Sequence, residues 1–506
     1  MKIVVAPDAY KGTLTQVDAA NIIKNAIMEV DATHNVVIKP MADGGEGMLD
    51  ALLRAIPDSK RLPVKVTGPL GRKIETCIGV VYEDTAVIEI ASMAGLPFVP
   101  KDSRDPYKTT TYGIGEAIRI ALDKQFRKFI IGLGGSATND GGFGMLMSLG
   151  ATFKNSRGEH VGIFGEHLLE IETIHLETLD PRLASCTIRV ATDVENPLCG
   201  QNGATFVFGP QKGANRQQIE YLDQAMGNYS KRMQKTNSLS LSLDKEPGAG
   251  AAGGLGFAFM AMGGKLLSGA KLISEVIELE DEIKHADLVI SGEGESDTQT
   301  LDGKAPGYVA ALARKYHVPS MLISGNVTVE DRSALLDQFT EIHTLINGTF
   351  SKKQAMNQPK MVLFNRTKEI FKYIQNQGGI TMVKAIHTED APAAIGPYSQ
   401  AIEAGNFVYV SGQIGIDPQT KEVEGGIEKQ TKQVLENLKA ILTEAGTDFS
   451  EVVKFTIYLD SMDDFATVND IYGGYLQEPY PSRATVEVGG LPKGALVEMD
   501  VVVYKK

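Results

Sequence analysis

The chain has 506 residues, and chains this long usually divide into roughly two to four domains, because single hydrophobic cores stop growing near ~250–300 residues. Its 43% hydrophobic and 22% charged residues are typical of a globular protein, and its net charge of −13 argues against a nucleic-acid or anionic-membrane surface. The three cysteines form no CxxC pair, the N-terminus does not resemble a signal peptide, and no apolar run reaches the ~18 residues of a membrane helix. We therefore expect a cytoplasmic protein with reduced thiols.

Up to about residue 375, short β-branched runs alternate with helical patterns. The runs include "KIVVAP", "NVVIKP", "KFIIGLGG", "TIRVATD", "DLVISGEG" and "SMLISGN", and helical spacing appears between them in "TQVDAANIIKNAIMEV" and "YGIGEAIRIALDKQF". This alternation predicts a largely parallel α/β sheet. Residues 63–91 instead alternate with period two, which predicts an antiparallel insertion.

Polar or acidic side chains follow the predicted strands. They are Asp8, Asp43, Ser136, Asp193, Glu293 and Ser324. In open α/β sheets, ligands bind beyond the carboxyl ends of the strands, so we expect a ligand site where these side chains meet.

The segment "IIGLGGSATNDGG" (130–142) runs from a strand directly into glycines. Gly132, Gly134 and Ala137 satisfy the dinucleotide fingerprint, but the expected acid about 20 residues later is replaced by Lys154 and Asn155, which disfavours NAD. No P-loop pattern is present in the sequence. Two readings stay open: a glycine turn that serves packing, and a phosphate cradle whose backbone approaches an anion closely. The cradle would consist of Gly134, Gly135, Ser136, Thr138 and Asn139.

A junction is predicted where "FKYIQNQ" gives way to "GGIT". Gly378 and Gly379 break the helical pattern, and Met382 opens a segment that reads like a new N-terminus. We predict a domain over 1–377, a linker over 378–381 and a second domain over 382–506. An ordinary interdomain turn is the alternative.

Residues 1 to about 375 resemble the bacterial type 1 glycerate kinase family. The resemblance rests on nine segments in order, namely "APDAYKGTLT", "PMADGGEG", "TTTYGIGEAI", "IGLGGSATNDGGFGM", "ATDVENPLCG", "VFGPQKGA", "PGAGAAGGLGFA", "DLVISGEG" and "DGKAPGYVA". It implies phosphorylation of D-glycerate by ATP with Mg²⁺, most often at the 2-hydroxyl. It also implies two α/β lobes, one of about 1–60 and 280–377 and the other inserted at about 61–279, with the site in the cleft between them.

Residue roles in the kinase follow as hypotheses from this resemblance. Asp193 is the candidate base or metal ligand, Lys11 would neutralise developing charge, and Asp43 and Glu46 are further candidate metal ligands. The candidates for binding glycerate are Asp8, Arg72, Lys212 and Glu293. Family members often carry Arg after "GEG", where this chain has Glu295, for which we expect a surface position. A non-catalytic binder of small molecules with the same cleft is the rival reading.

The last 125 residues alternate like strands in "NFVYVSGQIG" and "VVKFTIYLD" and contain two amphipathic helical stretches. This pattern predicts a small α+β domain with helices on one face of a sheet. The domain resembles the reactive-intermediate (Rid) deaminase family in "AIGPYSQA", "VSGQI", "VLENLKAIL", "FATVNDIY", "PSRATVEV" and "LPKGALVEM". The resemblance implies a homotrimer with a chorismate-mutase-like barrel, active sites between subunits, and hydrolysis of 2-imino acids without a cofactor.

The resemblance also implies the residues of the imine site. Arg483 would clamp the substrate carboxylate, and Glu498 would position or activate water. The pocket positions are Tyr398, Ser411, Gly412, Asn469 and Thr485, the last where many family members have Cys. The alternatives are a domain that only trimerises or binds, and a fusion made artificially or by merging adjacent reading frames.

Overall fold

The computed structural model describes residues 1–236, 242–301, 303–376 and 383–505. The chain forms two compact units, Met1–Phe371 and Lys372–Lys506, called here the N-terminal and the C-terminal unit. The linker predicted at 378–381 lies outside the described residues. Within those residues, no helix has both the length and the apolar character needed to cross a membrane.

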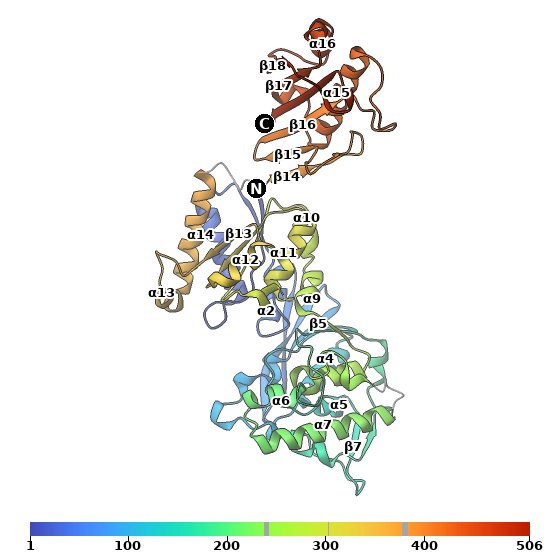
Figure 1. Ribbon diagram of the computed structural model, residues 1–506. Helices are drawn as coiled ribbons and strands as arrows, with labels where there is room; N and C mark the ends of the chain where they lie inside the picture. Colours follow the sequence, from blue (N-terminus) through green and yellow to red (C-terminus); the bar gives the residue numbers. More distant parts are fainter. Residues whose placement is uncertain (237–241, 302, 377–382, 506) are drawn as a thin grey trace. The chain divides into compact units, whose positions relative to one another are not determined.

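The N-terminal unit contains two main sheets (Figure 1). The first is five-stranded and entirely parallel, in the order β13-β12-β11-β1-β2. Its strands are β1 (Lys2–Val5), β2 (Asn35–Ile38), β11 (Leu288–Glu293), β12 (Ser320–Ser324) and β13 (Glu341–Thr344). The helices next to these strands in the sequence are α1 (Gln16–Val30), α2 (Met48–Ala55), α9 (Gly269–Val276), α10 (Leu279–Lys284), α11 (Ala305–Lys315), α12 (Val329–Leu336), α13 (Lys352–Asn357) and α14 (Pro359–Asn376). The last of them, α14, extends beyond Phe371, where this unit ends.

The second sheet is six-stranded and mixed, in the order β10-β9-β6-β5-β4-β3. Its strands are β3 (Lys60–Thr67), β4 (Lys73–Val81), β5 (Thr85–Glu89), β6 (Lys128–Gly132), β9 (Thr187–Ala191) and β10 (Lys265–Leu267), and a separate antiparallel pair is formed by β7 (Thr152–Lys154) and β8 (Thr173–His175). The helices of this stretch are α3 (Ala91–Ala94), α4 (Tyr112–Asp123), α5 (Phe143–Ser148), α6 (Ala204–Phe208), α7 (Arg216–Thr236) and α8 (Ala251–Ala261). The chain thus builds this sheet between β2 and β11 of the first sheet.

The predicted elements of this unit are confirmed. All six predicted strands are present, the two predicted helices form α1 and α4, and β3, β4 and β5 pair antiparallel as residues 63–91 indicated. Buried β-branched runs suit parallel strands, which are covered on both faces. A shared core in which Val4, Leu52, Val87 and Ile130 are all buried joins the two sheets.

The C-terminal unit is a six-stranded mixed sheet with two helices on one face (Figure 1). The sheet order is β14-β15-β16-β19-β17-β18, in which the β17–β18 pair is parallel. The elements are β14 (Val383–Ile386), β15 (Ala401–Ala404), β16 (Phe407–Ile414), α15 (Ile427–Glu444), β17 (Val452–Leu459), α16 (Phe465–Gly473), β18 (Ser482–Glu487) and β19 (Val497–Tyr504). Alternate strand residues pack under the helices, which confirms the α+β pattern predicted for this part of the chain.

Candidate functional site

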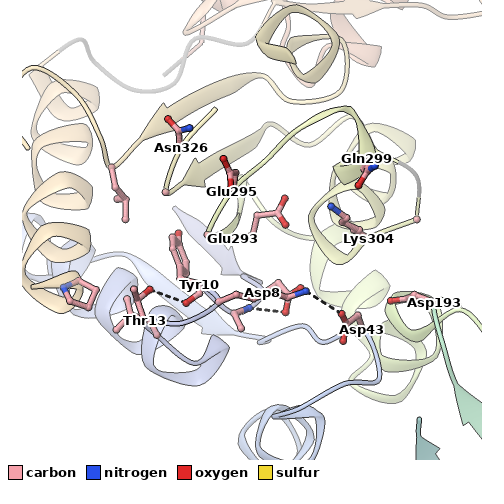
Figure 2. Close-up of a pocket in the computed structure, with 18 of the residues that line it drawn as sticks. Asp8, Tyr10, Thr13, Asp43, Asp193, Glu293, Glu295, Gln299, Lys304 and Asn326 are labelled. Carbon is pink, nitrogen blue, oxygen red and sulfur yellow. Dashed lines mark hydrogen bonds and ion pairs between the residues drawn. The ribbon is translucent and has the colours of Figure 1, made fainter. Parts of the chain in front are cut away.

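A cavity of about 950 Å³ opens in the N-terminal unit where strands of both sheets end (Figure 2). Asp8 follows β1, Asp43 follows β2, Asp193 follows β9, and Glu293 is the last residue of β11. Four of the six side chains predicted to converge at strand ends therefore line one cavity. Ser136 and Ser324 are buried instead.

Asp8 is a buried carboxyl group with a raised pKa. Its Oδ1 accepts a hydrogen bond from the backbone N–H of Ala9 at 2.7 Å. Burial, reinforced by the neighbouring carboxylates of Asp43 and Glu293, raises the pKa of Asp8 to about 7. A carboxyl group that titrates near neutrality can both accept and return a proton at physiological pH.

Asp193 belongs to the same group of carboxylates but is fixed by another element. Its Oδ1 accepts a hydrogen bond from the backbone N–H of Gly269 at 2.9 Å. Burial raises the pKa of Asp193 to about 7, and Asp43 adds to this rise. Asp193 therefore also titrates in the range expected of a general base.

Positive charge reaches the cavity on long side chains. Lys11 Nζ lies 4.0 Å from Asp43 Oδ2, and the Lys11 side chain is 83% exposed, so it can follow a ligand. Lys304 Nζ lies 3.6 Å from Asp297 Oδ1, and Lys352 also lines the cavity. Another part of the wall is apolar and includes Ile346 and Met356. The cavity thus combines the four carboxylates at strand ends, three lysine side chains and an apolar part of its wall.

Several lining residues were not predicted as site residues. They are Tyr10, Thr13, Gln299, Lys304, Asn326 and Lys352. Lys304 lies in the family-matching segment "DGKAPGYVA", and Asn326 follows the predicted strand of "SMLISGN". These two positions could therefore have been predicted from the sequence. Glu295 is exposed, as expected, but it is exposed on the wall of the cavity and adds a further acid there (Figure 2).

The glycine segment lies behind the cavity. Gly134 donates its backbone N–H to Gly44 O at 3.0 Å, and a Cβ at position 134 would stand 2.3 Å from Gly45 Cα. Ser136, Thr138 and Asn139 are buried. In the described part of the chain, the cavity wall includes none of the five residues predicted as a phosphate cradle. Here the glycines serve a close approach to the loop that carries Asp43.

Three other predicted residues also lie away from the cavity. Lys212 is buried and donates hydrogen bonds to Ser136 Oγ at 3.1 Å and to Thr138 O at 2.6 Å. Burial lowers the pKa of Lys212 to about 7. Arg72 and Glu46 are exposed, and neither is among the residues that line the cavity in the described structure.

Magnesium is the metal implied for this cavity. Among the described residues, no three His, Cys, Asp or Glu side chains are grouped closely enough to hold a metal by themselves. Carboxylate oxygens are nevertheless suitable ligands, and Mg²⁺ is usually held by one or two carboxylates together with substrate phosphates. Asp43 adds to the raised pKa of Asp193, because the two negative charges repel each other, and a cation near the pair would relieve that repulsion. The donor set therefore fits Mg²⁺ brought in with a nucleotide.

In the C-terminal unit, Arg483 lies on the face that the helices cover. Its Nη1 donates to Asn469 Oδ1 at 2.8 Å, and its guanidinium carbon lies 5.5 and 5.2 Å from the ring centroids of Phe465 and Tyr472. These three partners belong to α16. The guanidinium is thereby held in one orientation while the residue remains exposed.

Glu498 lies on the opposite face of the same sheet. On β19, residues Val497, Met499 and Val501 are buried under the helices, so Glu498 points the other way. Burial, with Asp500 adding to it, raises the pKa of Glu498. Because Arg483 pairs with Phe455, which pairs with Val501, the arginine and the glutamate of one chain face opposite sides.

The other predicted pocket residues divide between these two places. Asn469 and Thr485 lie on the same face as Arg483. Asn469 accepts a hydrogen bond from Arg483, and Thr485 is two positions further along the same strand. Gly412 lies against Glu498, because a Cβ at position 412 would stand 1.9 Å from Glu498 Oε1. Ser411 donates to Ser399 O at 2.7 Å, and Tyr398 is exposed. The predicted imine-site residues of one chain therefore do not form a single group.

Comparison with known proteins assigns the two regions separately. Residues 3–375 match the model of the "Glycerate kinase family", and residues 388–505 match the model described as "Endoribonuclease L-PSP". The chain is 44% identical over 330 residues to the Glycerate 2-kinase of Escherichia coli K12, covering 65% of this chain and 86% of that protein. It is 37% identical over 372 residues to the Glycerate kinase of Bacillus subtilis 168, covering 73% of this chain and 97% of that protein.

Solved structures resemble each region. A protein of Salmonella typhimurium LT2 assigned as glycerate kinase 2 is 37% identical, with a TM-score of 0.67, over 74% of this chain and 99% of that chain. RidA of the Antarctic bacterium Psychrobacter sp. PAMC 21119 is 49% identical over 24% of this chain and 98% of that chain, with a TM-score of 0.24. The second region is recognised by its match to the family model over residues 388–505.

Proposed function

The chain belongs to the glycerate kinase family over residues 3–375 and carries a Rid/L-PSP domain over residues 388–505, and from this we propose that it is a bifunctional enzyme. Its N-terminal unit would phosphorylate D-glycerate with ATP, and its C-terminal unit would hydrolyse 2-imino acids. The observation that supports the kinase most directly is one cavity lined by the four strand-end carboxylates and three lysines, namely Asp8, Asp43, Asp193, Glu293, Lys11, Lys304 and Lys352.

In the proposed kinase reaction, the cavity orients the two substrates rather than forming a covalent intermediate. Asp193 accepts the proton of the attacking glycerate hydroxyl, and Lys11 neutralises charge that develops on the transferred phosphoryl group. The adenine ring lies against the apolar wall near Ile346 and Met356. Asp43 would hold Mg²⁺, which would screen the phosphate charge when bound, and Asp193 then stays available to accept the proton.

We propose 2-phosphoglycerate as the product, supported by the name of the Escherichia coli relative. The test is an ADP-release assay with D-glycerate, L-glycerate and hydroxypyruvate, followed by identification of the phosphorylated product. ADP release that depends on D-glycerate is the expected result. If the chain binds D-glycerate and MgATP but releases no ADP, the cleft is that of a binding protein.

For the C-terminal unit we propose hydrolysis of a 2-imino acid to a 2-keto acid and ammonia. Water adds to the imine carbon, the tetrahedral adduct loses ammonia, and the oxygen of water remains as the keto oxygen. Arg483 binds the substrate carboxylate through paired hydrogen bonds. Glu498, with its raised pKa, accepts a proton from the attacking water and returns it to the leaving nitrogen.

We propose a homotrimer, the assembly that the resemblance to the Rid family implies. Arg483 and Glu498 of one chain lie on opposite faces of their sheet, so a site that contains both needs more than one copy. A site that contains both then takes Arg483 from one copy and Glu498 from another. Exposed apolar side chains on the glutamate face, among them Tyr409 and Tyr504, and the edge strand β18 with exposed Val486 fit coverage by further copies. A trimer mass in light scattering is expected, and a monomer at micromolar concentration would contradict the proposal.

Cleavage of RNA is the other activity that the matched description names. Acidic residues outnumber basic ones across 383–505, which disfavours a polyanion as substrate. Ammonia release from freshly generated 2-aminoacrylate above the spontaneous rate would establish the deaminase. The spontaneous rate alone would leave the domain a trimerising module, and cleavage of an RNA probe would establish the alternative enzyme.

A further inference from the structure

Glu293 is held at the cavity by two hydroxyl groups. Ser296 Oγ donates to Glu293 Oε1 at 2.9 Å, and Thr300 Oγ1 donates to the same oxygen at 2.7 Å. Glu293 is 8% exposed, and both hydroxyl-bearing residues are buried. Both bonds end on Oε1, and among the described residues no hydrogen bond to Oε2 is found, so Oε2 can accept one from a ligand in the cavity.

The two hydroxyls are themselves fixed by the turn that follows β11. Thr300 Oγ1 accepts a hydrogen bond from the backbone N–H of Asp297 at 3.1 Å, and Thr300 N–H donates to Asp297 O at 3.0 Å. Ser296 N–H donates to Asn326 O at 3.0 Å, and Ser296 Oγ lies 2.9 Å from Ser324 Oγ on β12. A buried network therefore ties the Glu293 carboxylate to two adjacent strands of the sheet, so its rotation is restricted.

We propose that Ser296 and Thr300 are positioning residues that orient Glu293 so that its Oε2 accepts a hydrogen bond from the non-reacting hydroxyl of the acceptor substrate. The inference rests on the proposed kinase activity and gives a physical reason why its acceptor needs two adjacent hydroxyl groups. One hydroxyl attacks the phosphoryl group, and the other is recognised by Glu293. A substrate that lacks the second hydroxyl leaves this fixed, mostly buried oxygen without its partner, which is the situation that gives strong discrimination.

Thr300 offers a matched pair of variants. Thr300→Val keeps the volume but removes the hydroxyl, whereas Thr300→Ser keeps the hydroxyl and removes a methyl group. For D-glycerate we expect Thr300→Val to lower kcat/KM by about 10-fold or more, because a hydrogen bond to a charged group is lost. We expect the kcat/KM of Thr300→Ser to stay within about 3-fold of the wild type, because this hydrogen bond is kept. A thermal melt of each full-length variant shows whether the fold is retained.

A substrate analogue gives a readout that a purely structural role would not move. D-lactate keeps the 2-hydroxyl that the proposed reaction phosphorylates and lacks the 3-hydroxyl that Glu293 would bind. We expect the wild type to prefer D-glycerate over D-lactate by about 100-fold or more in kcat/KM. Thr300→Val should narrow this preference by about 10-fold, because the variant loses activity on D-glycerate and not on D-lactate.

A double-mutant cycle with Glu293→Gln tests whether Thr300 acts through Glu293. If it does, adding Thr300→Val to Glu293→Gln lowers kcat/KM much less than Thr300→Val does alone. Equal losses in both backgrounds, or equal effects of Thr300→Val and Thr300→Ser, would overturn the inference. A wild-type protein without glycerate-dependent ADP release would instead refute the proposed function itself, so the two failures are distinguishable.

Discussion

The carboxylate of Asp193 is bound to the backbone of Gly269, whose N–H donates to Asp193 Oδ1 at 2.9 Å. Gly269 has no room for a side chain, because a Cβ there would stand 2.1 Å from Asp43 O. The turn between β10 and α9 therefore holds the segments that carry Asp193 and Asp43 close to each other. This contact connects the end of the six-stranded sheet to the end of the five-stranded sheet, where the cavity lies.

Asp193→Asn should lower kcat for D-glycerate by about 10²–10⁴-fold, because the amide cannot accept the proton of the substrate hydroxyl. ADP release under saturating MgATP measures the effect. Asp281→Asn is a suitable control, since Asp281 is an exposed acid in α10 paired with Lys284. Near-normal turnover by Asp193→Asn would refute the assigned role.

Asp8→Asn should change stability in a pH-dependent manner. The pKa of Asp8 rises from an ordinary 3.8 to about 7 on folding, so between these values the folded state holds a proton that the unfolded state has released. The stability of the wild type therefore falls as pH rises from about 4 to about 7, and the penalty is complete above pH 7. Without divalent cations, Asp8→Asn should raise the Tm relative to the wild type more at pH 8 than at pH 5. An equal difference at both pH values would contradict the raised pKa.

Gly134→Ala separates the two readings of the glycine segment. If the glycine serves packing, a Cβ 2.3 Å from Gly45 Cα should destabilise the N-terminal unit by about 1–3 kcal/mol. Gly227→Ala is the control, because Gly227 lies in α7 with open space around its Cβ position and the change should stabilise the helix by roughly 0.5–1 kcal/mol. A raised KM for ATP without loss of stability would instead favour the phosphate cradle.

Gly412→Ala should abolish imine hydrolysis while leaving the kinase active. The added Cβ would collide with Glu498 Oε1, so the carboxylate must move from its place. Gly473→Ala, at the end of α16 with nothing near its Cβ position, should retain both activities. The two activities are measured on the same preparation, as ammonia release and as ADP release.

Arg483→Ala should also abolish imine hydrolysis, and Arg483→Lys should reduce it by about 10²-fold. Lysine keeps the charge but not the paired donors of a guanidinium, nor its flat contact with Phe465 and Tyr472. Glycerate-dependent ADP release should not change in either variant. Loss of both activities would show that the two sites are not independent.

Local sequence patterns predicted most of the elements. The buried runs at β1, β6 and β11 are continuous because parallel strands are covered on both faces, and the alternation at β3 to β5 reflects antiparallel pairing. Asp8, Asp43 and Glu293 come after strands of one sheet, and the carboxyl ends of its parallel strands share one edge. Asp193 comes after β9 of the other sheet, so its place at the same cavity depends on how the two sheets pack.

Local sequence patterns could not predict which of two loops lines the cavity and which one packs against the other loop. Gly134 packs against Gly45 from a position 89 residues later, and this places the glycine segment behind the loop of Asp43 instead of in the cavity. Lys212 became a buried donor to Ser136 and Thr138 for the same reason. Burial depends on contacts between residues that are far apart in the sequence, and these contacts cannot be predicted from residue type and spacing alone.

Periodicity and local chemistry were enough to predict the α/β and α+β classes and four carboxylates that line the cavity. Which of the other predicted polar residues line the cavity depends on packing between segments that are remote in sequence. The tertiary structure also placed Arg483 and Glu498 on opposite faces of their sheet, since the strand register that links them through Phe455 and Val501 is set by long-range pairing.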